Sequence, residues 1–435
     1  MVSGVATSVI NTGLIFLSYP LYLHFLGYEK LGVWLVLSTI ISFVQMSNLG
    51  LGSAVTKLVA EEYGRGDIAA IQGYVATALA TLMVTGIIAL GALILFRTSI
   101  VGIFRLGDDN ARTAIQLLPF MGILTLYVFL VQILSATLSG LGRMDQVNYR
   151  DSFCRVISLS VGVALLYRGF GLIGLLVASA VSNLFMHAAS VVLIRRIISV
   201  PLVRIDRWDR QRFTKLLSFG GGVLGSSLIS MFLSPFNKLM LSRYAGVSTV
   251  PIYEIAFTGS MQIRSLVEVA LRALMPEISR IAAEKNEQSL KRVASIYRRS
   301  IRIIWSAGFP VYVLAFLLAT PLLKVWLGGT FLESLPVVFR IMLIGSFLSL
   351  LCVPAYYTLM GFSGIKHCFL SSVAQAITNV SIVSLIVLTA GVLSIHSFAW
   401  SVMCAHGVTC AYVLLARWRT LAFAQELVPT QEARQ

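Results

Sequence analysis

The chain has 435 residues, of which 57% are hydrophobic and only 12% are charged, and its mean hydropathy is +0.86. Soluble domains carry about 25% charged residues, so this composition excludes a soluble globular protein. A net charge of +16 would favour nucleic-acid binding in a soluble chain. In a membrane protein the same charge is explained by where the cations lie along the chain.

Transmembrane helices are predicted from runs without Asp, Glu, Lys or Arg, because a helix that crosses a bilayer needs about 20 mostly apolar residues. Nine such runs give ten helices, since the last run is long enough for two helices broken near Gly391. Two further helices carry charge, at 147 to 167 and 250 to 275. The prediction is an all-α integral membrane protein with about twelve transmembrane helices. The nine runs are 1 to 28, 31 to 56, 68 to 96, 113 to 142, 169 to 194, 216 to 237, 303 to 323, 341 to 365 and 367 to 416.

The distribution of Lys and Arg predicts the topology. With the N-terminus in the cytoplasm, the cytoplasmic segments hold 21 of these residues and the opposite side holds seven. This bias fits the positive-inside rule with both termini in the cytoplasm, so no nucleic-acid partner is expected. The predicted domains are a six-helix lobe at 1 to 194, a basic cytoplasmic linker at 195 to 215, a second six-helix lobe at 216 to 416 and a cytoplasmic tail at 417 to 435.

Short segments of the first half recur in the second half at offsets of 219 to 221 residues. Six helices per half is an even number, so the two lobes have the same orientation and are predicted to be related by a pseudo-twofold axis along the membrane normal. The alternative is that glycine and aromatic residues recur at membrane interfaces by composition alone. The matching pairs are 27 to 34 with 246 to 253, 54 to 67 with 273 to 286, and 137 to 140 with 358 to 361.

Three segments of the first half, FLGYEKLGVW (25 to 34), NLGLGSA (48 to 54) and EEYGRGD (61 to 67), carry a family resemblance. Two segments of the second half agree with it, NKLML (237 to 241) and MPEISR (275 to 280). Together they resemble the polysaccharide transporter (Wzx-type flippase) family of the multidrug/oligosaccharidyl-lipid/polysaccharide exporter superfamily.

The resemblance implies a twelve-helix, two-lobed flippase in a bacterial inner membrane. It implies movement of an undecaprenyl-diphosphate-linked oligosaccharide from the cytoplasmic to the periplasmic leaflet by alternating access. The sequence contains no nucleotide-binding motif, so an ion gradient is the expected energy source. The implied partners are that lipid-linked substrate, the membrane lipids, and a polysaccharide polymerase with its glycosyltransferases. The family often has an acidic residue where this chain has Asn237, so no coupling carboxylate is expected there.

Charged residues inside the predicted helices are candidate site residues, because charge at bilayer depth is costly and normally faces a protein interior or a wet cavity. Glu254, Arg264, Glu268 and Arg272 fall within an arc of about 80° around one helix. In the functional interpretation Arg264 and Arg272 bind diphosphate oxygens, while Glu254 and Glu268 are the ion-coupling groups. In the structural one, Arg264, Glu268 and Arg272 form a self-neutralising ladder at i, i+4 spacing.

Four other charged residues complete the candidate set. Lys238 either joins the substrate-binding cations or extends its stem to the outer interface. Arg340 either joins them or lies at the membrane boundary. Asp151 and Arg155 are spaced i, i+4 and are predicted to pair, either as a gate or as a structural ion pair. The isolated His187 and His406 show no metal-ligand spacing and are expected to make interhelical hydrogen bonds; no metal and no cofactor is expected.

Two other classes of function stay open at this point. A drug exporter of the same superfamily would prefer an acidic cavity, but six cations within the predicted helices outnumber three acids, and residues 1 to 28 contain no acid. A membrane-embedded polysaccharide-assembly enzyme would need catalytic groups on large external loops. The predicted outer loops are short and contain no Ser/His/Asp set and no phosphate-cradling glycine loop, so the chain is not expected to be an enzyme.

Overall fold

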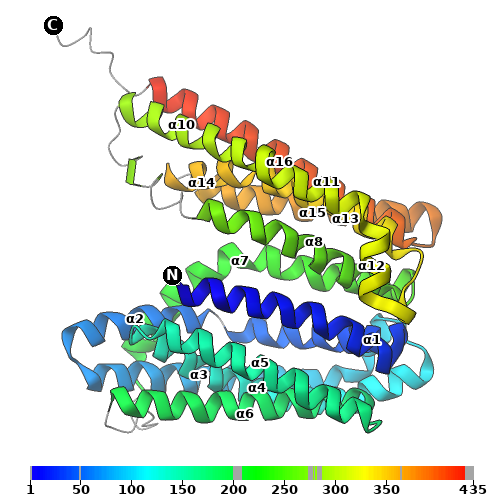
Figure 1. The fold of residues 1–435 in the computed structure, drawn as a ribbon. Coiled ribbons are helices and arrows are strands. Elements are labelled where there is room, and N and C mark those ends of the chain that lie inside the picture. Colours follow the sequence, from blue (N-terminus) through cyan, green and yellow to red (C-terminus); the bar gives the residue numbers. More distant parts are fainter. Residues whose placement is uncertain are drawn as a thin grey trace, which may run out of the picture. The chain divides into compact units, whose positions relative to one another are not determined.

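The computed structural model describes residues 2–48, 50–198, 208–272, 278, 280–281, 287–362 and 365–426. All regular elements in these residues are helices, with no strand among them (Figure 1). Eight of the described helical stretches are long and apolar enough to cross a membrane, judged by length and composition. The predicted fold class, an all-α integral membrane protein, is confirmed.

The chain divides into two compact units, Met1–Val250 and Pro251–Gln435. In the first unit, α5 packs on α6, α3 on α4, and α7 lies against α1, α2 and α3. The elements of this unit are α1 (Val2–Gln45), η1 (Met46–Asn48), α2 (Leu51–Arg65), α3 (Ile68–Ile103), α4 (Asp108–Gly140), α5 (Met144–Tyr167), α6 (Gly171–Ile197) and α7 (Arg210–Tyr244).

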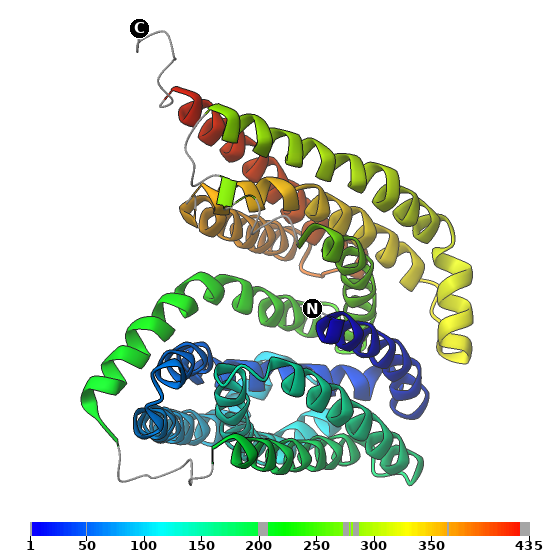
Figure 2. The same cartoon turned by 60° about the vertical axis from the view of Figure 1, so that its left-hand side comes forward.

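The second unit contains most of α8, which begins at the end of the first unit, and all later helices. Here α16 packs on both α13 and α15, and α10 contacts α14 and α16. Figure 2 shows α10 close to the C-terminal part of α16, which it contacts. The elements are α8 (Thr249–Arg272), α10 (Glu287–Ile303), the π-helical turn η3 (Ile304–Gly308), α11 (Phe309–Leu317), α12 (Ala319–Leu327), η4 (Gly328–Thr330), α13 (Leu335–Leu351), α14 (Val353–Gly361), α15 (Ile365–Ala390) and α16 (Ile395–Glu426).

Two breaks between helices lie close to their predicted positions. Within α1 the backbone of Gly27 is left-handed, with φ 66° and ψ 176°, so α1 is two helices joined at the predicted break. The break expected near Gly391 lies between α15 and α16, where Gly391 has φ 69°. Several helix bounds differ from the predicted runs. The predicted helix at 31 to 56 is divided between α1, which ends at Gln45, and α2, which begins at Leu51; α16 continues to Glu426, beyond the predicted end at 416, and α10 begins well before the apolar run at 303. The polar residues outside the apolar runs extend α10 and α16, because the hydrogen bonds of a helix form within its own backbone and do not require apolar side chains.

The matching segments of the two halves share local structure. Gly246 has φ 95°, which places it in the same left-handed region as Gly27. Thr137 and Thr358 each donate a hydrogen bond of 2.8 Å to the carbonyl four residues earlier, and each is buried. Segment 273 to 286 lies mostly outside the described residues. At these positions the two halves therefore share local backbone structure as well as similar sequence.

Packing within the first unit relies on close helix contact. Inside a bilayer, helices gain little from the hydrophobic effect, so van der Waals packing dominates. A side chain on Gly86 of α3 would collide with Leu126 and Phe129 of α4, and one on Gly122 of α4 would collide with Leu90 of α3. The proposed boundary between lobes, 195 to 215, stays a prediction; residues 199 to 207 lie outside the described chain.

Candidate functional site

Arg264 and Glu268 form an ion pair on α8, as their spacing predicts. The distance from Arg264 Nη2 to Glu268 Oε2 is 3.3 Å, and the two side chains are 26% and 18% exposed. Tyr357 of α14 donates its hydroxyl to Glu268 Oε1 at 3.3 Å. Glu268 therefore bridges a cation on its own helix and a phenol on a neighbouring helix.

The ion pair leaves part of the Arg264 guanidinium unused. Its Nε is buried and has no hydrogen-bond partner in the described part of the chain, and its Nη1 faces only the sulfur of Met261, at 4.0 Å. A guanidinium has five N–H donors, and a buried donor left unpaired is unfavourable by about 1 to 3 kcal/mol. Arg264 is thus a partly buried cation with donors still available for an anionic ligand.

Two buried polar side chains, Tyr312 of α11 and His406 of α16, lie close enough to Arg264 for its charge to act on them. Gln375 Nε2 of α15 lies 3.2 Å from His406 Nδ1, which is the expected interhelical hydrogen bond. His406 Nε2 is buried and has no partner within the described residues. Neither residue could be placed near Arg264 from the sequence, because both lie on helices far away in the chain.

The other members of the predicted α8 stripe have different surroundings. Glu254 lies about 15 Å from Arg264 along the helix axis, is partly buried and has an interaction partner. The side chain of Arg272 lies outside the described residues. The structure therefore brings Arg264 and Glu268 together and leaves Glu254 at the opposite end of α8.

Lys238 lies near the end of α7 in the first unit, where it is buried together with Asn237 and has an interaction partner. The end of α7 is fixed to the end of α3, because Ser242 Oγ and Arg243 Nη1 each donate a 2.9 Å hydrogen bond to the carbonyls of Phe104 and Ile103 respectively. Lys238 is thus held on an anchored part of α7.

Arg340 of α13 stabilises the end of another helix. Its Nε donates to the carbonyl of Phe316 at 3.0 Å, and its Nη2 donates to Thr320 Oγ1 at 3.1 Å. The carbonyls in the last turn of a helix have no intrahelical partner, so a guanidinium placed there satisfies an open acceptor. In this structure Arg340 caps α11 where the chain passes into α12.

Asp151 forms an ion pair, but its partner is Arg150 and not the predicted Arg155. Asp151 instead accepts from Arg150, with Arg150 Nη2 at 2.6 Å from Asp151 Oδ1, while Arg155 is exposed. The Arg150 side chain is only 4% exposed, because it points between helices and donates to Ser190 of α6 and, at 2.8 Å, to Ser135 of α4. The role of Arg150 could not be predicted from the sequence, since its serine partners are 40 and 15 residues away.

No group of three or more His, Cys, Asp or Glu side chains able to hold a metal ion occurs in the described ranges.

A family model described as polysaccharide biosynthesis protein matches residues 24–336. The match covers well over half of the sequence. The chain belongs to the polysaccharide biosynthesis protein family. This family member is also 21% identical over 386 residues to a Shigella flexneri protein provisionally named O-antigen transporter, with 87% of each chain covered.

Solved structures show the fold to which this family member belongs. An inward-facing MATE family multidrug resistance transporter of the MOP superfamily has a TM-score of 0.74 at 15% identity, with 96% of each chain covered. The lipid II flippase MurJ in an inward closed conformation has a TM-score of 0.74 at 13% identity, covering 98% of this chain and 89% of that one. The predicted two-lobed, twelve-helix fold class is confirmed.

The predicted family is confirmed as well, because the family model for polysaccharide biosynthesis proteins matches residues 24–336. The named relatives are transporters and flippases, in agreement with the prediction of a transporter and not an enzyme. This family member is a multi-pass membrane protein, and it is a transporter or flippase of polysaccharide biosynthesis.

Proposed function

We propose that the chain moves an undecaprenyl-diphosphate-linked oligosaccharide from the cytoplasmic to the periplasmic leaflet of a bacterial inner membrane by alternating access. The observation that carries the proposal is Arg264, a partly buried arginine of α8 with a buried Nε that no described residue accepts from. The family, and the name of the Shigella flexneri relative, support the substrate class.

The chemistry of Arg264 suits a diphosphate. Phosphate oxygens accept paired, charge-assisted hydrogen bonds from a planar guanidinium, and such bonds are stronger in a poorly hydrated setting. Arg272 and Lys238 are proposed as supporting cations. Arg340 is placed last in this set, because its donors already bind the end of α11.

Ion coupling is proposed to pass through Glu268, with Glu254 as the second candidate. A diphosphate bound to Arg264 competes with Glu268 for the guanidinium, while the hydrogen bond from Tyr357 to Glu268 stays in place. A partly buried carboxylate whose pairing with an arginine weakens binds a proton or a cation more readily. Asp151 and Arg155 are proposed to act at the gate, with Asp151 held by Arg150.

Transport can be tested with the full chain in vesicles that contain a fluorescent lipid-diphosphate oligosaccharide. An impermeant oxidant added outside the vesicles reacts only with substrate in the outer leaflet. We expect the oxidised fraction of the substrate to change faster in vesicles that contain the protein than in protein-free vesicles. A folded protein that gives no acceleration, or that moves a cationic dye instead, would contradict the proposal and favour the drug-exporter alternative. Transport that persists after gradients are collapsed would contradict only the coupling.

Topology can be tested by labelling single cysteines in a cysteine-free variant with an impermeant maleimide added to whole cells. Tyr167 and Trp208 are both exposed, at 82% and 51%. We expect Tyr167→Cys to react in intact cells and Trp208→Cys to react only after permeabilisation. The reverse pattern would place the termini outside the cytoplasm.

A further inference from the structure

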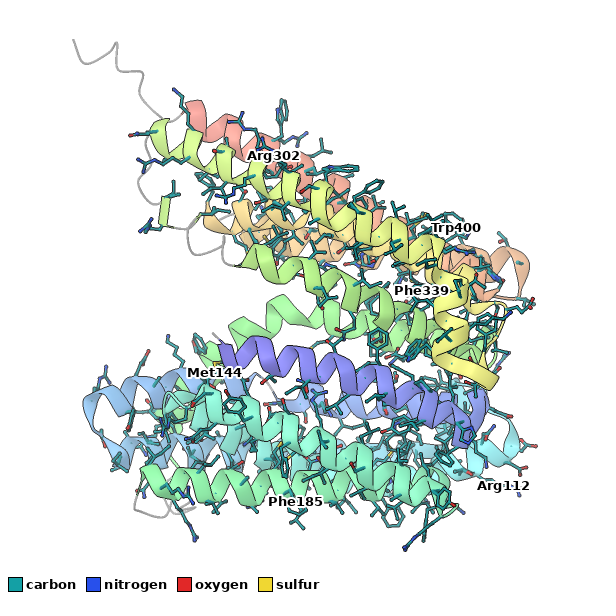
Figure 3. The ribbon with its side chains drawn as sticks, viewed as in Figure 1. Arg112, Met144, Phe185, Arg302, Phe339 and Trp400 are labelled. Carbon is teal, nitrogen blue, oxygen red and sulfur yellow. The ribbon has the colours of Figure 1, made fainter. Side chains whose placement is uncertain are left out.

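Helix α10 has a cationic face that the proposed transport function does not use. Five of its residues, Lys291, Arg292, Arg298, Arg299 and Arg302, are exposed and fall within an arc of about 120°. Figure 3 labels Arg302 on this helix. The opposite side is buried, with Val293 and Ser300 at 0% and 1% exposure, so the cations share one outward surface. We call these five residues the α10 cationic face.

Cations elsewhere in the structure are often neutralised by nearby acids. Lys57 pairs with Glu61 at 3.7 Å, and Arg65 pairs with Glu62 at 3.1 Å. Arg212 pairs with Asp209 at 3.8 Å. By contrast, no carboxylate among the described residues pairs with the three arginines nearest the apolar end of α10, which are Arg298, Arg299 and Arg302.

An exposed tryptophan continues this face toward the apolar end of the helix. Trp305 follows Arg302 by three residues and is 49% exposed; on α16, which contacts α10, Trp418 is 68% exposed. The two helices are joined by Arg417, whose guanidinium lies 3.4 Å from the ring centre of Tyr297. Tryptophan and tyrosine prefer the level of the lipid head groups. The apolar run from 303 then continues into the bilayer, so the cationic face lies at the membrane boundary.

We infer that the α10 cationic face binds the phosphate head groups of anionic phospholipids. Basic clusters directly beside a transmembrane helix attract anionic lipid, by about 1 kcal/mol per Lys or Arg near the surface. The complementary ligand has to lie in the plane of the membrane, because Trp305 and the apolar run fix the depth of the arginines. This ligand is the surrounding lipid, distinct from the transported substrate.

The test uses the purified, delipidated full chain, titrated with short-chain phosphatidylglycerol and, separately, with phosphatidylcholine. Bound lipid is counted by native mass spectrometry. We expect the preference for phosphatidylglycerol to fall about fivefold per arginine, and on the order of a hundredfold in the triple variant Arg298→Gln, Arg299→Gln, Arg302→Gln. The triple change to lysine should keep most of the preference, since the attraction depends on charge.

A matched control removes the same charge from exposed arginines of the first unit, Arg105, Arg112 and Arg168, each changed to Gln. Soluble phosphate at equal ionic strength should not displace the lipid, whereas raising the salt concentration should weaken binding. The inference is overturned if the glutamine variant keeps the wild-type preference while the chain stays folded, or if the control loses as much. Displacement by soluble phosphate, or preference for an acidic protein over lipid vesicles, would overturn it too.

Discussion

Replacing Arg264 by alanine should stop transport while the protein stays at normal abundance in the membrane. The change removes a guanidinium whose Nε and Nη1 make no strong contact with the residues that the structure describes, so the fold loses little beyond the pair with Glu268. A diphosphate would lose two charge-assisted bonds of about 1.5 to 3 kcal/mol each, which corresponds to a rate loss on the order of a hundredfold or more. Arg264→Lys, which keeps the charge but not the paired geometry, should retain partial transport.

The measurement is the amount of lipid-linked oligosaccharide on the cytoplasmic leaflet, divided by the amount of protein in the membrane. Arg112→Ala, which removes an exposed arginine from the first unit, is the control and should transport normally. If Arg264→Ala and the double change with Glu268→Ala both transport normally, the cationic mechanism on α8 is wrong. If only the double change restores abundance and transport, the ion pair is structural.

Replacing Arg150 by alanine should reduce the stability of the first unit. The side chain joins α5 to α4 and α6 through Ser135 and Ser190 and also holds Asp151. Hydrogen bonds to a charged group contribute about 1.5 to 3 kcal/mol each, and the partly exposed Asp151 recovers some of that loss from solvent, so we expect a net loss of about 2 to 4 kcal/mol.

Arg155→Ala is the matched comparison for this prediction, because Arg155 lies five residues away on the same helix and is exposed. A change at an exposed site usually shifts stability by less than about 0.5 kcal/mol. The thermal unfolding midpoint of each purified variant in the same detergent gives the answer. Equal midpoints for the two variants would show that the network around Arg150 does not hold the three helices.

The sequence predicts the helices well because their strongest signal is local. A charge-free run long enough to span a bilayer is visible without knowing any neighbour, and the breaks at Gly27 and Gly391 lie where the runs end or are divided. The pair of Arg264 and Glu268 was also predictable, since residues four apart face each other on any helix.

Contacts between helices were not predictable in the same way. Asp151 has two candidate arginines nearby in sequence, and the choice of Arg150 depends on two serines from other helices. The role of Arg340 depends on where α11 ends, which frees the carbonyl of Phe316. Tyr357 reaches Glu268 from 89 residues away. Each of these partners is determined by tertiary packing, which cannot be inferred from the spacing of residues along one helix.

The π-helical turn at Ile304–Gly308 corrects the angular phase of its helix. Val293 and Tyr312 are both buried, yet at 19 residues apart they would lie about 100° apart around an unbroken α-helix. A π turn takes up one additional residue, which is about 100° of rotation, so it realigns the inward side of α11 with that of α10. The π turn thereby accommodates one additional residue, and the side chain of Tyr312 is buried in the interior and does not face lipid.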